Sequence, residues 1–180
     1  MRIDLHDGFY LGPVEDGDQA AYLEHLNDRD VTDWMLVIPY PYTEKDADFW
    51  VRHCLDMAST HPHISEFAIR RADGFLVGGM GVRLKTGLGH HRGELGYWLG
   101  RSFWGRGLAT AGVRAVSAYA FETLNLKRIE ATAFPDNKAS HRVLDKAGFV
   151  REGVLKGYHL KNGILIDACM YALVKNDDCV

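Results

Sequence analysis

Residues 96–110 have the sequence GYWLGRSFWGRGLAT, the most informative stretch of the chain. The apolar residues before Gly100 fit the end of a strand, and a helix is predicted to begin near Gly107. The first amide groups of a helix have no partner within it, and the helix dipole adds partial positive charge there. Glycine lets a ligand approach the backbone closely, and Arg106 adds a full charge. The stretch therefore predicts a cradle for a phosphate group.

Two common phosphate-binding patterns do not fit these residues. Gly107 and Gly112 have the spacing of a Walker loop, but Val113-Arg114 follows in place of Lys-Ser/Thr. The dinucleotide pattern fails because Thr110 stands where its third glycine is required. A simpler alternative stays open, in which the glycines only serve a tight turn from strand to helix.

The composition is that of an ordinary globular protein. The chain has 180 residues and a mass of 20.2 kDa, which predicts a single domain over residues 1–180. Hydrophobic residues make up 47% and charged residues 25%, which excludes disorder, collagen and coiled coil as the main state. No apolar run approaches the ~18 residues of a membrane span, and residues 1–7 show no signal peptide. We therefore expect a cytoplasmic protein with no membrane partner.

Cysteine and histidine give no sign of a disulfide framework or a metal site. Cys54, Cys169 and Cys179 are scattered and odd in number, and we expect Cys54 in helix packing and Cys169 in the core of a strand. The histidines at 61 and 63, and those at 90 and 91, match no zinc template.

Charge is unevenly distributed along the chain. Residues 1–60 contain four basic and 13 acidic residues, a net charge of −9, whereas residues 61–180 contain 17 and 11, a net charge of +6. The overall charge of −3 argues against nucleic acid as a partner. Solvated helix surfaces are the simpler interpretation of the asymmetry. The alternative is an acidic lobe that attracts a cation beside a basic part that holds a polyanion.

Hydrophobic periodicity and turn residues predict one sheet flanked by helices, a mixed α/β (α+β) fold. The helix over residues 107–124 has a narrow polar strip, Thr110, Arg114 and Ser117, so its other sides are expected to be buried. Strands are expected at residues 9–14, 65–70, 75–84, 93–99, 128–133, 149–161 and 164–175, and helices at residues 15–27, 28–34, 43–59, 107–124 and 137–147.

Local signals mark several of these boundaries. Thr43, with Asp46 three residues later, predicts a helix start, and Gly148 predicts a helix end. Asn162-Gly163 predicts a tight hairpin. The glycines at 78, 79 and 81 indicate a bulge or a close approach of another group to the backbone.

Four short motifs occur in order within residues 94–153. They are residues 94–99 (ELGYWL), 104–109 (WGRGLA), 137–140 (NKAS) and 148–153 (GFVREG). Together they resemble the GNAT superfamily of acyl-CoA N-acyltransferases, and within it the ribosomal-protein N-acetyltransferases of the RimJ/RimL type. The second motif is similar to the family's pyrophosphate loop, Arg/Gln-x-x-Gly-x-Gly/Ala, with Trp104 in the first place as in that branch.

The resemblance implies the GNAT fold, a central mixed and mostly antiparallel sheet of about six or seven strands with flanking helices. Its fourth and fifth strands, here residues 93–99 and 128–133, splay apart. The pantetheine arm of acetyl-CoA is expected in that gap, and the pyrophosphate on the backbone amides of the glycine-rich loop. The implied cofactor-binding residues are Trp98, Leu99, Gly105, Arg106, Gly107, Leu108, Ala109, Thr110, Asn137 and Ser140.

The implied activity is transfer of an acetyl group from acetyl-CoA to a primary amine, by direct attack in a ternary complex. Such a reaction needs a donor for the oxyanion and a proton for the leaving thiolate, and the resemblance assigns these roles to the Leu99 N–H and to Ser140. Glu94, acting through water, and His159 are alternative bases. Catalysis by positioning alone, without a dedicated base, is the third option.

The acceptor site is implied to lie under the helices that follow the first strand. Asp28, Asp30, Asp33, Trp34 and Tyr40 are therefore candidates for binding a cationic amine or a peptide N-terminus. Each of them is alternatively a solvated helix residue or a packed aromatic. A protein N-terminus and a small-molecule amine both stay open as the acceptor, and the resemblance is compatible with a homodimer. The alternative function is a catalytically silent acyl-CoA-binding module on the same fold.

Overall fold

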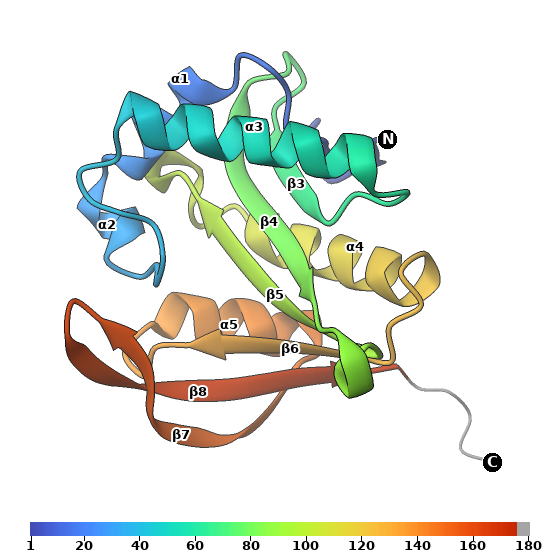
Figure 1. Ribbon diagram of the computed structural model, residues 1–180, viewed down its shortest axis with the longest axis vertical. Coiled ribbons are helices and arrows are strands. Elements are labelled where there is room, and N and C mark those ends of the chain that lie inside the picture. Colours follow the sequence, from blue (N-terminus) through green and yellow to red (C-terminus); the bar gives the residue numbers. More distant parts are fainter. Residues whose placement is uncertain (176–180) are drawn as a thin grey trace.

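Eight strands form one sheet in the computed structural model, which describes residues 1–175 (Figure 1). Their order is β1-β2-β3-β4-β5-β6-β8-β7, and of these neighbouring pairs β5 and β6 are parallel and the others antiparallel. The expected mixed, mostly antiparallel sheet is confirmed. The strands are β1 (Ile3–Asp4), β2 (Tyr10–Gly12), β3 (Glu66–Arg70), β4 (Leu76–Leu84), β5 (Arg92–Leu99), β6 (Arg128–Ala133), β7 (Val150–Lys161) and β8 (Ile164–Val174).

The sheet has one strand that the sequence did not predict. It is β1, which pairs with β2 through Ile3 opposite Leu11 and Asp4 opposite Tyr10. A strand of two residues is too short to show an alternating pattern, so hydrophobic periodicity could not find it.

Helices cover both faces of the sheet (Figure 1). The first three lie on one face, where Val51 and Tyr22 belong to one apolar cluster, and the last two lie on the other, where Val113 and Ile129 belong to a second. The helices are α1 (Gln19–Leu26), α2 (Arg29–Thr32), α3 (Glu44–Thr60), α4 (Leu108–Glu122) and α5 (Lys138–Ala147), with short 3₁₀ turns η1 (Gly87–Gly89) and η2 (Arg101–Phe103).

Three local signals are confirmed in the structure. Asp46 Oδ2 accepts a hydrogen bond from Thr43 N at 2.9 Å, and Thr43 Oγ1 accepts one from Asp46 N at 3.3 Å, which together form a capping box. Gly148 ends α5 with φ at 93°. Asn162 and Gly163 connect β7 to β8 with φ at 52° and 78°, the left-handed conformation that a tight hairpin turn requires.

The expected polar strip of α4 is wrong at one position. Ser117 is 3% exposed, and its Oγ has no hydrogen-bond partner within residues 1–175. The helix packs against β4, β5 and also α5, so more of its circumference is covered than contact with a sheet alone would cover.

β5 and β6 separate soon after they meet. They are paired only through Arg92 with Arg128, Gly93 with Ile129 and Glu94 with Glu130. Beyond these positions β5 runs on to Leu99 and β6 to Ala133 without pairing with each other, as the expected splay requires.

Both cysteines in the described part of the chain are free and buried, Cys54 in the cluster under α1 and α3 and Cys169 in the cluster under α4, as predicted. Cys179 lies outside the described residues. Across residues 1–175, no helix is both long and apolar enough to cross a bilayer. Over the same range, no three His, Cys, Asp or Glu side chains come together in a way that could hold a metal ion.

A buried ion pair joins α1 to the sheet. The Arg70 guanidinium on β3 donates to Asp18 Oδ1 at 2.9 Å and to Asp18 Oδ2 at 2.7 Å, and it also donates to the carbonyls of Gly74 and Pro13. The two side chains of the pair are 3% and 9% exposed. Removing one partner would leave the other charge buried and unpaired.

We predict that Asp18→Ala lowers the free energy of unfolding by about 3–5 kcal/mol, because the Arg70 charge then stays in the core without its counter-charge. Urea denaturation measures this. Asp4→Ala, which removes an exposed pair with Arg2, serves as the control and is expected to change stability far less. An equal loss in both variants would contradict the role given to the buried pair.

Candidate active site

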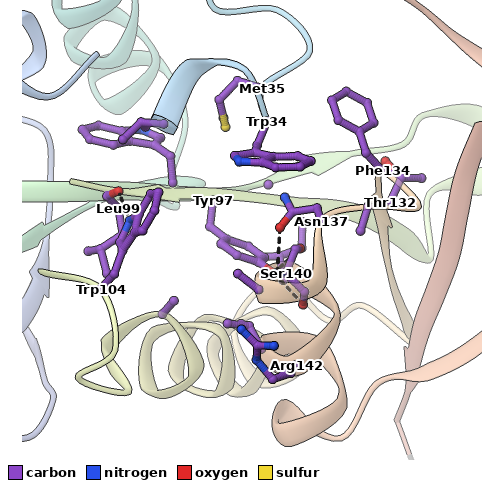
Figure 2. A pocket seen from close by; sticks show the side chains of 18 of the residues that line it. Trp34, Met35, Tyr97, Leu99, Trp104, Thr132, Phe134, Asn137, Ser140 and Arg142 are labelled. Atoms are coloured by element: carbon purple, nitrogen blue, oxygen red, sulfur yellow. Dashed lines mark hydrogen bonds between the residues drawn. The ribbon is translucent and has the colours of Figure 1, made fainter. Parts of the chain in front are cut away.

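A cavity of about 650 Å³ opens where β5 and β6 separate (Figure 2). It is lined by β5, the first turn of α4, the end of β6, the start of α5 and the segment after α2. Among the site residues predicted from the sequence, the lining includes Trp34, Glu94, Trp98, Leu99, Gly105, Gly107, Leu108, Ala109, Thr110, Asn137, Ser140 and His159. Asp28, Asp30, Asp33, Tyr40 and Arg106 are not part of this lining.

The glycine-rich loop enters α4 through two left-handed residues. Gly105 has φ at 76° and Gly107 has φ at 78°, a conformation that costs other residues about 1–2 kcal/mol. Gly107 is the N-cap of α4, so the amides of the first turn, from Leu108 to Thr110, have no acceptor within the helix. The turn geometry therefore requires glycine, and it also directs unpaired amides at the cavity edge, so both interpretations of the glycines agree with the structure.

Trp104 holds this loop against the end of β5. Its indole Nε1 donates a hydrogen bond to Leu99 O at 2.7 Å (Figure 2). On the other edge of β5, Gly100 N donates to Val77 O of β4 at 2.8 Å. Because successive peptide groups of a strand point to opposite edges, the N–H of Leu99 faces the side from which β6 has diverged. A ligand in the gap can reach this N–H.

Tyr97 and Ser140 form a hydrogen-bonded pair inside the cavity, with their hydroxyl oxygens 2.7 Å apart (Figure 2). Ser140 also lies in the first turn of α5, where Asn137 Oδ1 accepts a hydrogen bond from its backbone N at 3.0 Å. Burial raises the pKa of Tyr97 to about 12, so its phenol stays protonated near neutral pH. Tyr97 was not among the residues predicted from the sequence, although the alternation along β5, which turns it away from Trp98, was an available signal.

The two predicted bases lie on the cavity wall. Glu94 Oε2 accepts a hydrogen bond from Lys85 Nζ at 2.7 Å. His159 Nε2 is 3.1 Å from Thr132 Oγ1, and its ring lies edge-on to Phe134. Burial lowers the pKa of His159, and the charge of Glu94 opposes this shift only in part. His159 is therefore neutral near pH 7 and able to accept a proton.

The acidic residues predicted for the acceptor site are placed outside the cavity. Asp30 forms an ion pair with Arg101 at 2.7 Å, and Tyr40 lies under the Arg29 guanidinium at 4.5 Å. The backbone carbonyl of Asp33 accepts a hydrogen bond from Lys161 Nζ at 2.7 Å. Their role in acceptor binding stays a prediction.

The segment that follows these acidic residues does reach the cavity. Trp34 lines it together with Met35, Leu36 and Val37, and Phe134 adds a further apolar side chain from beyond β6. Figure 2 shows Trp34 and Met35 on the opposite side of the cavity from Ser140. The Arg106 side chain, in contrast, lies over the ring of Phe103, 5.5 Å from its centre.

Comparison with known proteins assigns the family. Residues 9–150 match the acetyltransferase (GNAT) domain. The chain is 31% identical over 169 residues to the uncharacterized N-acetyltransferase p20 of Bacillus licheniformis, which covers 93% of each chain. A GNAT-family acetyltransferase from Bacillus anthracis has a TM-score of 0.83 at 25% identity, over 98% of this chain and 100% of that one. Mycobacterium smegmatis RimJ, solved in complex with CoA-disulfide, has a TM-score of 0.77 at 28% identity, over 93% and 82%.

This chain therefore belongs to the GNAT family of acetyltransferases, and RimJ-type enzymes are among its relatives. Enzymes of this family use acetyl-CoA as the acetyl donor.

Proposed function

We propose that this acetyltransferase moves an acetyl group from acetyl-CoA directly to a primary amine while both substrates are bound. The observation that carries the proposal is a single cavity that extends from the first turn of α4 through the gap between β5 and β6 to Glu94 and His159. A donor that enters along α4 and an acceptor from the opposite face would meet inside this gap. The CoA-disulfide held by the similar RimJ of M. smegmatis supports the donor side.

The donor is proposed to bind mainly to the backbone. Its pyrophosphate would accept hydrogen bonds from the amides of residues 106–110, with Gly105 and Gly107 allowing close approach. Its pantetheine arm would lie along Trp98 and Leu99, where β5 lacks a neighbouring strand, with Asn137 beside it.

In the reaction, the amine nitrogen attacks the thioester carbonyl carbon, and the carbon–sulfur bond then breaks. The Leu99 N–H would donate to the oxyanion, and the Ser140 hydroxyl would give its proton to the departing sulfur. Tyr97 stays protonated, so it would donate to Ser140 Oγ and stabilise the serine oxygen as it loses its proton. Direct attack is favoured because neither Cys54 nor Cys169 lines the cavity to serve as an acetyl carrier.

Glu94 and His159 are proposed to take the proton that the nitrogen loses once it has attacked. Both side chains line the same wall, and the neutral imidazole of His159 has a proton-accepting nitrogen. Glu94 is tied to Lys85, so it would act through water rather than by moving.

The lining favours an amine that is attached to an apolar group, such as the N-terminus of a peptide, over a polyamine. The segment after α2 supplies apolar side chains, and the only acidic residues of the lining within residues 1–175 are Glu94 and Asp136. Asp30 and Asp33 are proposed to act at long range, as a negative field that attracts the ammonium group.

We predict that Gly107→Ala raises the Kd for CoA about tenfold. An alanine at φ 78° costs about 1–2 kcal/mol, and the loop relieves that strain by moving the amides of the first turn. Isothermal titration calorimetry measures the Kd. Gly17→Ala, at a glycine with φ at 100° that is not part of the lining, is the matched control with an unchanged Kd. Equal affinity in both variants would contradict the proposed cradle.

We predict that Ser140→Ala lowers kcat by about 10²-fold, the lower end of what general acid catalysis contributes, with little change in the Kd for CoA. Steady-state kinetics of thiol release measures kcat. Ser117→Ala, a buried serine outside the cavity, should keep wild-type kinetics. Full activity of the Ser140 variant would contradict the proposed role of Ser140 as the proton donor to sulfur.

The function itself is tested by thiol release from acetyl-CoA with a panel of peptides, amino acids and polyamines. We expect turnover with peptides that have a free N-terminus and an apolar first residue, and none with the same peptides acetylated at the N-terminus. Binding of CoA without turnover on any acceptor would instead indicate a silent binding module.

A further inference from the structure

Glu66 is an acidic residue that is not part of the cavity lining and was not predicted as part of the site. It begins β3, and it pairs with Gly81 of β4, which in turn pairs with Gly96 of β5. Residues that are directly opposite in antiparallel strands point to the same face, so these three positions form one row across the sheet.

The Glu66 carboxylate occupies the place of a side chain on Gly81. A Cβ on Gly81 would lie 2.0 Å from Glu66 Oε2 and 2.6 Å from Oε1. At Gly81, the close approach to the backbone that the sequence indicates is thus made by a carboxylate. At the next position in the row, a Cβ on Gly96 would meet no atom within 4 Å, and Gly96 lines the cavity.

No side chain of this row separates the carboxylate from the cavity, whereas the rows on both sides are filled. The Trp98 indole lies over Gly79, 2.6 Å from where its Cβ would be. On the other side, Arg83 of β4 lies opposite Glu94 of β5, so both positions of that row carry side chains. The two glycines therefore leave a passage one residue wide between Glu66 and the space above Gly96.

The surroundings of Glu66 contain little that would hold it ionised. Within residues 1–175 no hydrogen bond or ion pair to its carboxylate is formed. Two titratable groups act across it, Arg83 from β4 and Cys54 from α3, whose thiol stays neutral because burial raises its pKa to about 12. Burial outweighs the attraction of Arg83 and raises the pKa of Glu66 to about 7.

We propose that Glu66 accepts, through a water molecule above Gly96, the proton that the ammonium form of the acceptor must lose before it can attack. This inference rests on the proposed function. In the step, the N–H bond breaks, its electron pair stays on nitrogen, and the proton ends as an O–H on the Glu66 carboxyl, from which it returns to solvent through the cavity. Glu94 and His159 keep the later proton, which leaves the nitrogen after attack.

The acidities of the two partners suit this transfer. An α-amino group has a pKa of about 8 and an ordinary glutamate a pKa of about 4.3. An ordinary carboxylate would therefore take up this proton only against a large difference in pKa. A carboxyl group with a pKa of about 7 takes up the proton against a pKa difference of only about one.

The test is the pH dependence of kcat/KM for the wild type and Glu66→Gln, with two acceptors of different basicity. One is a peptide with a free N-terminus (pKa about 8), and the other is an alkylamine with a pKa near that of lysine, about 10.4. For the wild type we expect an acidic limb with its midpoint near 7 for both acceptors, because the enzyme uses their ammonium forms. For Glu66→Gln we expect the limb to follow the pKa of each acceptor.

At pH 7 the Glu66→Gln variant should therefore lose about fivefold in kcat/KM with the peptide and much more with the alkylamine, and it should recover as the pH approaches each acceptor's pKa. The Kd for CoA should not change. Glu122→Gln, an exposed residue of α4, is the matched control and should keep the wild-type profile.

A second readout does not depend on activity. In carbon-13 NMR, the carboxyl signal that is missing from Glu66→Gln should titrate near pH 7 in the wild type. A midpoint near 4.3, or identical pH profiles in wild type and variant, would overturn the inference while the proposed function stands. A wild-type protein that binds CoA but acetylates no amine would instead contradict the proposed function and, with it, this inference.

Discussion

The pairing of β5 with β6 ends at Glu94, and beyond it no strand within residues 1–175 pairs with this edge of β5. Backbone groups without partners are costly when they are buried. The protein satisfies one of them internally, because the Trp104 indole donates to Leu99 O, and it leaves the neighbouring N–H facing the gap. The interruption of the sheet is thus what allows a ligand to bond to β5 as a missing strand would, and the cavity, the proposed donor site and the acceptor site all depend on it.

The alternation of side chains along β5 divides the chemistry between the two faces of the sheet. The side chain of Tyr97 points toward α5 and meets Ser140. The side chains of Glu94 and Trp98 point to the opposite face, and the position of Gly96 is on that face too. In a continuous sheet these two sets would be separated by the backbone. Because the sheet is open here, they border one cavity, so the proposed proton donor for sulfur and the proposed proton acceptors for nitrogen lie on different sides of it.

Much of the fold could be predicted from the sequence because its signals are local. The capping box at Thr43, the C-cap at Gly148 and the hairpin at Asn162 each depend on residues a few positions apart, and all are confirmed. The separation of β5 from β6 was predicted only from the resemblance to a family, because no local pattern encodes it. Most of the site residues that the resemblance implied line the cavity, while Asp28, Asp30 and Asp33 lie outside it.

The features that were missed join residues far apart in the chain. Arg70 and Asp18 are 52 positions apart, and Tyr97 and Ser140 are 43 apart, so neither pair has a signature in a sequence window. Glu66 and Gly81 meet only through the register of β3 and β4. The burial of Ser117 depends on how α4 packs against the sheet and α5 together.

A crystal structure with CoA bound tests the central claim most directly. Both phosphates of the pyrophosphate are expected within hydrogen-bond distance, about 3 Å, of backbone nitrogens between Arg106 and Thr110, with the thiol sulfur in the gap beside Ser140. A pyrophosphate bound elsewhere, or a thiol that does not enter between β5 and β6, would contradict it.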